Sequence, residues 1–222
     1  MKIAISGLGR MGGQIARKLH EDGHTVIVHN RSKGPIDEAA SYGAIPAYTK
    51  EDVIKNFDGD RVVLWVMIPA DVIDTEIDDW LKVLPAGSLL IDGGNSDYRG
   101  DEARSERVQN AGSTLLDIGT SGGVWGVTNG FSMMIGGDED SYKAIIPALD
   151  TLSKPNGGHE FFGPSGAGHY VKMVHNAIEY GMMESLAEGY RMLKEGPYKS
   201  LDLAKAGDVW QQSSVVTSWL ND

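Results

Sequence analysis

Residues 2–30, KIAISGLGRMGGQIARKLHEDGHTVIVHN, decide the fold class of this chain. The apolar residues 3–5 predict a short strand, and residues 15–19 belong to a predicted helix that Gly23 ends. A Gly-x-Gly-x-x-Gly turn joins the two elements. This order is typical of a turn that holds the pyrophosphate of a dinucleotide at a helix N-terminus. A glycine-rich turn without a ligand is the alternative interpretation.

The three glycines of the turn have separate expected roles. Gly7 permits the tight turn, Gly9 lets the backbone approach a pyrophosphate, and Gly12 allows the helix to pack closely on the strand. The predicted cofactor contacts lie in this turn and at the ends of the next strands. They are Gly7, Leu8, Gly9, Arg10, Met11, Gly12, Asn30, Arg31, Ser32, Val66 and Met67.

The end of the second predicted strand, residues 25–28, indicates which dinucleotide binds. An NAD site usually has an acidic residue here to bind the ribose 2′-hydroxyl, whereas this chain has His29-Asn30-Arg31-Ser32. Arg31 and Ser32 are suited to holding a 2′-phosphate, so NADP is expected in preference to NAD. A solvated loop charge is the alternative for Arg31.

Further apolar segments alternate with helical stretches along the chain. The predicted strands are 62–66, 89–91, 115–118, 131–135 and 161–162, and a helix is predicted over 141–152. This alternation predicts an α/β fold, a Rossmann-like, doubly wound and mainly parallel sheet. We expect it to occupy residues 1–165, with residues 166–222 forming a long helix and the beginning of an all-helical C-terminal domain.

Two glycine-rich clusters follow successive strands, at residues 92–96 (DGGNS) and 119–126 (GTSGGVWG). Ligands of doubly wound sheets bind beyond the carboxyl ends of the strands, where backbone N–H groups and short polar side chains are available. Each cluster alone is also ordinary turn chemistry. Their recurrence at successive strand ends favours a binding site.

A polar stripe marks the segment GAGHYVKMVHNAIEYGMM, residues 166–183. Lys172, His175, Asn176 and Glu179 have spacings that place them on one face of a helix. The apolar residues Val171, Val174, Ile178 and Met182 fall on another face, which is expected to be buried. The stripe suggests acid/base chemistry. A solvated helix face, with Lys172 paired to Glu179 and His175 used in packing, is the alternative.

Composition excludes several classes of protein. The formal net charge of −11 argues against nonspecific binding to nucleic acid and against attachment to an anionic membrane. The absence of cysteine excludes a disulfide scaffold and a Cys-ligated metal. No signal peptide or apolar stretch of about 18 residues is recognisable, so a cytoplasmic protein is expected.

Four motifs, GLGRMG, DGGNS, GTSGGVWG and GHYVKMVHNAIEYGMM, occur in this order. Their order and spacing resemble those of decarboxylating 6-phosphogluconate dehydrogenases, within the 6-phosphogluconate and β-hydroxyacid dehydrogenase superfamily. The resemblance covers nearly the whole chain. The related 3-hydroxyisobutyrate-type enzymes share the lysine and the asparagine four residues later, but lack counterparts of His175 and of Glu179-Tyr180.

The resemblance implies oxidative decarboxylation of 6-phosphogluconate to ribulose 5-phosphate and CO2, with reduction of NADP, in the pentose phosphate pathway. It implies Lys172 as the general base for the 3-hydroxyl and Glu179 as the general acid at C1. A lysine acts as a base only when its pKa is lowered, which burial achieves. The implied substrate contacts are Asn95, Ser121, Gly122, Gly123, His175, Asn176 and Tyr180. Asn95 is expected to contact the cofactor as well.

Members of this family continue into a larger helical domain that forms the dimer interface and completes the substrate phosphate site. Here two helices are predicted, 201–212 and 215–220, so the chain is expected to be a fragment or to have an incomplete substrate site. A homodimer or homotetramer is expected if the helical domain is complete, and no metal is expected. The alternatives are a β-hydroxyacid dehydrogenase that only transfers hydride and a non-catalytic dinucleotide-binding fragment.

Overall fold

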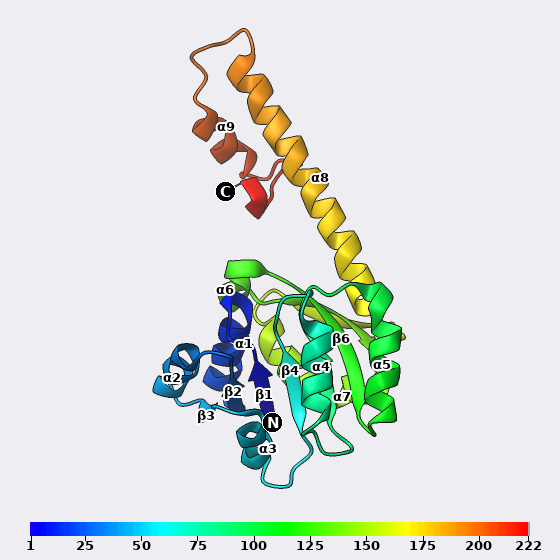
Figure 1. The fold of residues 1–222 in the computed structure, drawn as a ribbon. Helices are drawn as coiled ribbons and strands as arrows, with labels where there is room; N and C mark the ends of the chain where they lie inside the picture. The colour runs from blue at the N-terminus through cyan, green and yellow to red at the C-terminus, as the bar shows by residue number, and fades with distance from the viewer. Residues whose placement is uncertain (222) are drawn as a thin grey trace. The chain divides into compact units, whose positions relative to one another are not determined.

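A computed structural model describes residues 1–221 of the chain (Figure 1). The chain divides into two compact units, Met1–Met173 and Val174–Asp222. The division falls within one long helix, α8 (Ala167–Glu195). The predicted domain boundary after residue 165 stays a prediction.

The first unit is built on one eight-stranded sheet, in the order β3-β2-β1-β4-β5-β6-β7-β8. The strands are β1 (Lys2–Ser6), β2 (Thr25–His29), β3 (Ile45–Ala47), β4 (Val63–Val66), β5 (Leu89–Asp92), β6 (Thr114–Ser121), β7 (Ser132–Gly137) and β8 (Gly158–Gly163). Neighbouring strands from β3 to β6 are parallel, β7 is antiparallel to β6, and β8 is parallel to β7. The predicted Rossmann-like, mainly parallel sheet followed by a helical region is confirmed.

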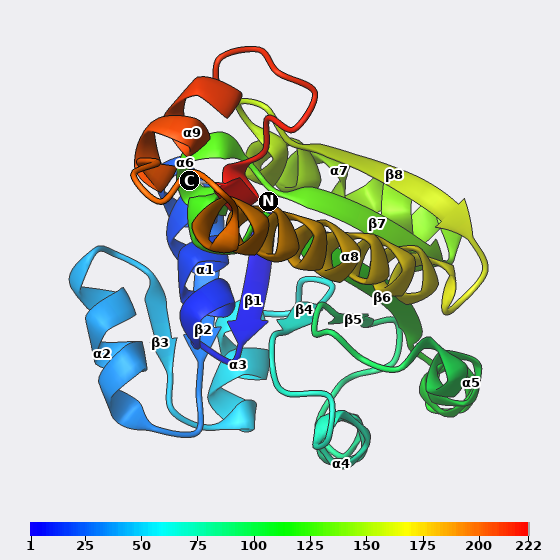
Figure 2. The same ribbon diagram turned by 90° about the horizontal axis from the view of Figure 1, so that it is seen from above.

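Helices cover both faces of this sheet, with α1 and α7 on one side and α4 and α5 on the other (Figure 2). Their bounds are α1 (Arg10–Glu21), α2 (Lys33–Ser41), α3 (Lys50–Phe57), α4 (Ile73–Leu81), α5 (Asp101–Asn110), α6 (Gly126–Asn129) and α7 (Glu139–Ser153). Two short 3-10 helices, η1 (Tyr98–Gly100) and η2 (Gly123–Trp125), lie in the loops after β5 and β6.

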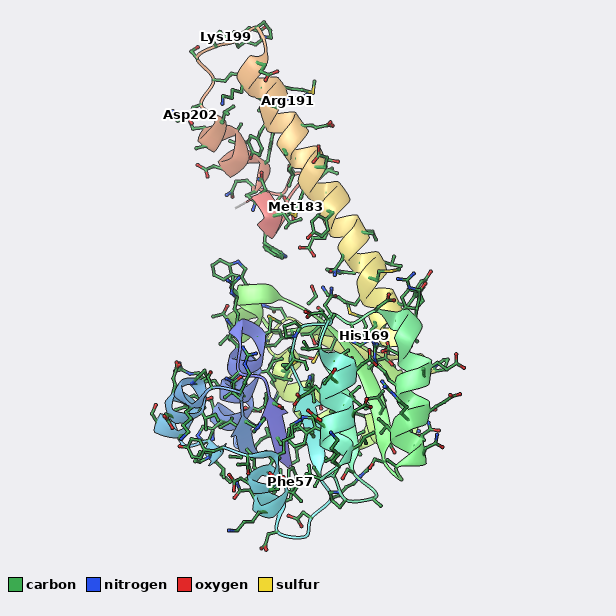
Figure 3. All side chains as sticks on the ribbon, viewed as in Figure 1. Phe57, His169, Met183, Arg191, Lys199 and Asp202 are labelled. Carbon is green, nitrogen blue, oxygen red and sulfur yellow. The ribbon has the colours of Figure 1, made fainter. Side chains whose placement is uncertain are left out.

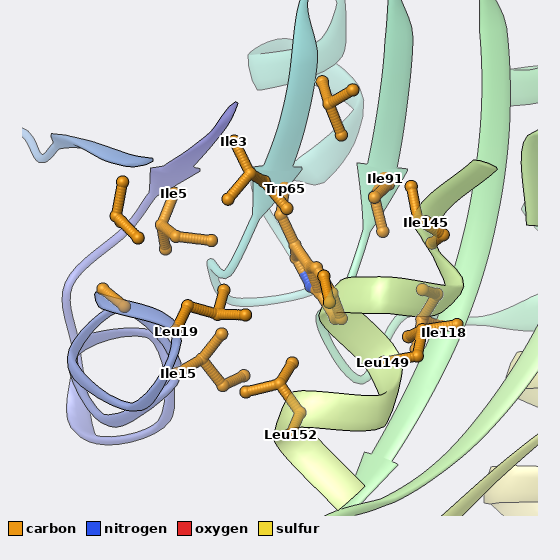
Figure 4. Packing of buried hydrophobic residues seen from close by; sticks show 14 of the residues in the cluster. Ile3, Ile5, Ile15, Leu19, Trp65, Ile91, Ile118, Ile145, Leu149 and Leu152 are labelled. Atoms are coloured by element: carbon orange, nitrogen blue, oxygen red, sulfur yellow. The ribbon is translucent and has the colours of Figure 1, made fainter. Parts of the chain in front are cut away.

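Alternation along the strands builds a separate apolar core on each face. Ile3 and Ile5 of β1 belong to the core beneath α1 and α7, whereas Ala4 between them belongs to the core beneath α3 and α4. Figure 4 shows the first core, where Trp65 lies between α1 and α7 residues such as Leu19 and Leu152. Burial on both faces explains why these strands are continuously apolar.

The second unit contains the rest of α8, α9 (Leu203–Trp210) and a 3-10 turn, η3 (Trp219–Asn221). Asp202 caps α9, since its carboxylate accepts hydrogen bonds from the backbone N–H groups of Ala204 and Lys205 at 3.1 and 3.3 Å. α9 therefore lies within the predicted helix 201–212.

The helix predicted over residues 215–220 is wrong, since only η3 forms at its end. Ser213 has a positive φ of 63°, which stops helical propagation after α9. The Thr217 hydroxyl then donates to the carbonyl of Trp210 at 3.0 Å, and the Ser214 hydroxyl accepts from the N–H of Val216 at 3.3 Å. Such local side-chain bonds compete with helical hydrogen bonds.

Within residues 1–221, no helix is both long enough and apolar enough to cross a membrane.

Candidate functional site

The order of the strands in the sheet runs from β1 to β3 on one side and from β4 to β8 on the other. The predicted dinucleotide turn lies between these two halves, at the end of β1. The N–H of Gly7 donates to the carbonyl of His29 at 2.9 Å, and the N–H of Met67 donates to the carbonyl of Ser6 at 2.7 Å. The ends of β1, β2 and β4 are thereby tied together. Ligands of doubly wound sheets bind at such a switch point.

The backbone of the turn requires glycine at two positions and leaves space at the third. Gly7 has a φ of +96°, and a Cβ there would lie 2.3 Å from the carbonyl oxygen of Met67. A Cβ on Gly12 would lie 1.9 Å from the carbonyl oxygen of Gly7. A Cβ on Gly9 would meet nothing within 4 Å. The backbone at Gly7 and Gly12 is therefore packed against the protein, whereas the space beside Gly9 is unfilled. A site in which backbone N–H groups approach a ligand closely requires this arrangement.

The start of α1 is suited to an anion. In Arg10–Glu21, all of which the structure describes, the first turn has no acidic residue, and Gly9 provides no side-chain cap. The N–H groups at a helix start carry partial positive charge and need acceptors. A dinucleotide pyrophosphate supplies such acceptors, so the residues present fit the expected cofactor.

Asn30 connects the turn to the end of β2. Its Oδ1 accepts a hydrogen bond from the N–H of Leu8 at 3.0 Å, and its Nδ2 donates to the Ser32 hydroxyl at 2.9 Å. Arg31 and Ser32 are exposed. A hollow of about 390 Å³ between α1 and α2 is lined in part by Gly9 and Arg10. The hollow is also lined by Arg17 and Glu38, and position 30 itself carries an amide in place of a carboxylate.

The two glycine-rich clusters follow adjacent strands of the sheet. Asp92 of β5 is paired with Asp117 of the parallel β6, so the two strands run towards the same edge of the sheet, where Asn95 follows β5 and Ser121 ends β6. Asn95 is exposed and Ser121 is half-buried. Gly122 and Gly123, which begin the η2 turn, are also half-buried. The structure thus brings Asn95 and the Ser121–Gly123 backbone to the same sheet edge as the dinucleotide turn.

Lys172 is buried, with 8% of its surface exposed. Two glycines make this possible. A Cβ on Gly119 of β6 would lie 2.2 Å from the Cβ of Lys172, and a Cβ on Gly168 would lie 2.4 Å from the carbonyl oxygen of Met134. Any larger residue at either position would push the first turns of α8 away from the sheet.

Asp117, in the middle of β6, holds the start of α8. Its two carboxylate oxygens accept hydrogen bonds from the N–H groups of Gly166 and His169 at 2.8 and 2.9 Å. Burial raises the pKa of Asp117, although these two N–H groups oppose the shift. The helix start is thus fixed from within the sheet by a buried side chain.

A second buried cluster surrounds His169, which Figure 3 labels. His169 Nδ1 lies 2.7 Å from Oδ2 of Asp101, whose Oδ1 accepts from Nη1 of Arg104 at 2.9 Å. One ring nitrogen of His169 and one oxygen each of Asp92 and Asp101 lie within 4.8 Å of one another. Sequence reasoning missed this cluster. The available signals were Asp92, an aspartate in an otherwise apolar strand, and His169, a histidine one helical turn before Lys172.

The other stripe residues belong to the second unit. Nδ1 of His175 lies 3.3 Å from Oδ1 of Asn176 and 3.7 Å from Oε2 of Glu179. Tyr180 is 71% exposed. The structure therefore brings His175, Asn176 and Glu179 together on α8, with Tyr180 directed to solvent.

The expectation that the apolar face of α8 is buried is wrong within the described chain. Val174, Ile178 and Met182 are 38%, 60% and 43% exposed, and Val171 is only partly buried. The buried residues of α8 are instead Gly168, His169 and Lys172. The reason is that backbone approach and buried hydrogen bonds, rather than apolar contacts, determine how this helix start packs.

Comparisons with known proteins give a consistent family. Residues 2–166 match the model of the NAD binding domain of 6-phosphogluconate dehydrogenase, and residues 168–222 match that of its C-terminal domain. A Haloferax volcanii protein named 6-phosphogluconate dehydrogenase, NAD(+)-dependent, decarboxylating, is 38% identical over 99% of this chain. An Aggregatibacter actinomycetemcomitans protein named 6-phosphogluconate dehydrogenase, decarboxylating, is 35% identical over 99% of this chain.

Solved structures agree with this assignment. The 6-phosphogluconate dehydrogenase of Plasmodium falciparum, solved with NADP+ and with 6-phosphogluconate, is 28% identical, with a TM-score of 0.86 over 96% of this chain. The 3-hydroxyisobutyrate dehydrogenase of Mycobacterium tuberculosis has a TM-score of 0.80 over 99% of this chain at 23% identity, which shows a shared fold.

These relatives are longer than this chain. It spans 72% of the Haloferax protein, 47% of the Aggregatibacter protein, 48% of the Plasmodium chain and 72% of the Mycobacterium chain.

Proposed function

This chain belongs to the 6-phosphogluconate dehydrogenase family, and we propose that it acts in the oxidative decarboxylation of 6-phosphogluconate to ribulose 5-phosphate and CO2 with NADP as oxidant. The observation that carries the proposal is the burial of Lys172 against Gly119, beside the sheet edge where the dinucleotide turn lies. A lysine is rarely buried without a specific use, and a buried amine is suited to act as a base.

In the proposed reaction, Nζ of Lys172 accepts the proton of the substrate's 3-hydroxyl as hydride leaves C3. A bound nicotinamide would supply the acceptor for that hydride. The resulting 3-keto acid loses its carboxylate as CO2, and the protonated Lys172 transfers its proton to the oxygen on which enolate charge develops. Glu179 then donates a proton to C1 of the enediol, while the enediol O–H proton returns to Lys172.

The remaining residues have proposed binding roles. Ser121, Gly122 and Gly123 bind the carboxylate end of the substrate, while Asn95 contacts both substrate and cofactor. In the second unit, His175 and Asn176 bind the sugar hydroxyls, and Tyr180 binds the 6-phosphate. The family resemblance supports these roles, together with the positions of the residues at the sheet edge and along α8.

Replacement of the lysine tests the proposal. Lys172→Met should retain cofactor binding and lose about 10²–10⁴-fold in the rate of NADPH formation from 6-phosphogluconate, because a proton acceptor is removed. Lys143→Met is the matched control, since Lys143 lies on α7 in an exposed ion pair with Glu139 at 2.9 Å. Near-normal turnover in the Lys172 variant would show that this residue has only a structural role.

Release of CO2 separates decarboxylation from simple hydride transfer. Glu179→Gln should slow proton incorporation at C1 by about 10²–10⁴-fold and leave cofactor binding unchanged. Glu184→Gln, at an exposed position of the same helix, is the control. NADPH formation without CO2 would identify a hydroxyacid dehydrogenase of the 3-hydroxyisobutyrate type. Cofactor binding without any turnover would identify a non-catalytic dinucleotide-binding fragment.

The choice of NADP over NAD is proposed from the absence of a carboxylate at Asn30 and from the exposed Arg31 beside it. One relative is named NAD(+)-dependent and another was solved with NADP+, so family membership leaves the choice open. Arg31→Ala should weaken NADP binding by about 1–3 kcal/mol and leave NAD binding unchanged. Arg99→Ala, on an exposed loop after β5, is the control. Equal weakening of both nucleotides would contradict the proposal.

A further inference from the structure

Residues 122–131 form the loop between β6 and β7, which carries the Gly122-Gly123 pair of the proposed substrate site. The outer side of this loop faces solvent, where Trp125 is 51% exposed. Its inner side lies on the buried ring of Phe131, since a Cβ on Gly126 would lie 1.9 Å from that ring. The position of the loop therefore depends on contacts at its inner side, including those made by other elements.

Lys18 of α1 makes one of these contacts. Its Nζ donates to the carbonyl oxygens of Val127 and Lys154, both at 2.8 Å. Val127 lies in α6, within the loop, and Lys154 directly follows α7. α6 lies against α1 (Figure 1). One ammonium group therefore joins three elements that are far apart in the sequence.

The ammonium group of Lys18 binds these carbonyls although a carboxylate is close in sequence. Asp22 follows Lys18 by four positions, the usual spacing of a helical ion pair. The carboxylate of Asp22 instead accepts from the Thr151 hydroxyl at 2.6 Å, and within residues 1–221 no ion pair joins it to Lys18. Carbonyl oxygens at the end of a helix lack donors within that helix, and a lysine side chain can satisfy them.

The end of α7 holds the same loop through backbone hydrogen bonds. The N–H of Phe131 donates to the carbonyl of Leu152 at 2.9 Å, and the N–H of Asn156 donates to the carbonyl of Asn129 at 2.9 Å. Since Lys18 contacts this end of the helix as well, α1, the loop and the end of α7 form one junction.

We propose that Lys18 is a positioning residue that fixes the loop 122–131 relative to α1. The start of α1 follows the turn proposed to bind the cofactor, and the loop carries backbone proposed to bind the substrate carboxylate, so this role rests on the proposed function. Lys18 lies about two turns along α1 from Arg10, the first residue of the helix. Attachment of both regions to one helix keeps the substrate at a fixed separation from the cofactor, on which the rate of hydride transfer depends.

Amide hydrogen exchange of the 222-residue protein tests the junction without requiring turnover. Lys18→Met should speed exchange of the Trp125 and Gly130 amides, which are bonded within the loop, by about tenfold. The amide of Gly7, which is bonded in the dinucleotide turn, should exchange as before. Lys143→Met removes an exposed lysine of α7 and is the matched control, which should leave all three amides unchanged.

Kinetics test the positioning role. Lys18→Met should lower kcat/KM for 6-phosphogluconate about tenfold and leave the Kd of NADP within about twofold, because the loop moves while the dinucleotide turn stays in place. Lys18→Arg, which keeps a positively charged donor, should recover most of the rate and of the amide protection. Lys143→Met should retain the kcat/KM of the unmodified protein.

Unchanged exchange at Trp125 and Gly130 in Lys18→Met would overturn the proposal. Faster exchange with an unchanged kcat/KM, or an equal loss of NADP binding and of kcat/KM, would overturn the positioning role. If Lys18→Met does not fold, amine modification of the unmodified protein tests the contact, because Lys18 should react more slowly than Lys143 and equal rates would contradict it.

Absence of turnover in the unmodified chain would contradict the proposed function instead. The exchange result would still decide whether Lys18 holds the loop to α1, because it is measured without substrate.

Discussion

Helix α8 has two regions with opposite surroundings. At its start, His169 and Lys172 are 2% and 8% exposed, although both are polar. In the second unit, Ile178 and Met182 of the same helix are 60% and 43% exposed, although both are apolar. The difference teaches that hydropathy does not decide burial here. Glycine contacts and buried ion pairs hold the first region to the sheet, whereas the second region contacts α9 through Tyr190, which lies against Gly207 and Trp210.

The largest effect is expected where the buried charges meet. Asp101→Asn should lower the free energy of unfolding of the first unit by about 3–5 kcal/mol, because His169 and Arg104 lose the buried anion that they share. Urea unfolding followed by circular dichroism measures the loss. Asp97→Asn, in an exposed pair with Arg99, is the control and should show a clearly smaller change. Equal effects in both variants would mean that burial of the first region does not depend on its charges.

A smaller effect is expected from the glycine contact beneath α8. Gly168→Ala should destabilise the first unit by about 1–3 kcal/mol, because the new Cβ would lie 2.4 Å from the backbone oxygen of Met134. It should also increase the exposure of Lys172 to amine-modifying reagents. If stability and lysine reactivity both stay unchanged, the close approach is not what buries the helix start.

The pH dependence of stability distinguishes the two regions further. The pKa of His169 is raised in the folded protein, so its stabilising contribution is complete below its ordinary value of 6.5 and is lost as pH rises through the folded value. The raised pKa values of Asp92 and Asp117 act in the same direction, from 3.8 upwards. One proton changes the free energy of unfolding by at most about 1.4 kcal/mol per pH unit.

Urea unfolding at several pH values tests this sign. The free energy of unfolding of the first unit should fall above pH 6.5, and His169→Gln should reduce the slope there. A rise in stability over this interval would contradict the assigned protonation state of His169.

The smallest effect is expected in the second region of α8. A Cβ on Gly181 would meet nothing within 4 Å, in contrast to Gly168. Gly181→Ala should therefore stabilise the second unit by about 0.5–1 kcal/mol through helix propensity alone. Thermal unfolding measures the gain. A loss of stability would show that this face of the helix is covered in the folded protein, which would weaken the contrast between the two regions.

The sequence predicts those elements whose signal is local. The Gly-x-Gly-x-x-Gly turn and the alternating apolar strands identify the sheet, because burial of both faces leaves continuous apolar runs. The short strand β3 was missed, and so were α2 and α3, although the Thr49–Asp52 capping box marks the start of α3.

Helix α5 shows why other features cannot be predicted from apolar periodicity. Its buried residues are Asp101, Arg104, Ser105 and Val108, so the face towards the core is mainly polar. The same limit applies to the candidate site. Lys172 could be singled out from its helical stripe, but its burial depends on Gly119, 53 positions earlier, and on a backbone contact that only the folded chain reveals.

The reversed direction of β7 and β8 determines how α8 travels over the sheet. Both strands run opposite to β6, so the chain leaves β8 at the edge of the sheet where β6 begins. α8 therefore travels back in the direction of β6, from the level of Asp117 at Gly166 to the level of Gly119 at Lys172. The position of a residue in the first turns of α8 therefore determines which residue of β6 it lies against. One residue inserted between Gly168 and Lys172 would advance the lysine by about 1.5 Å and rotate it by about 100°, and would therefore move it away from Gly119.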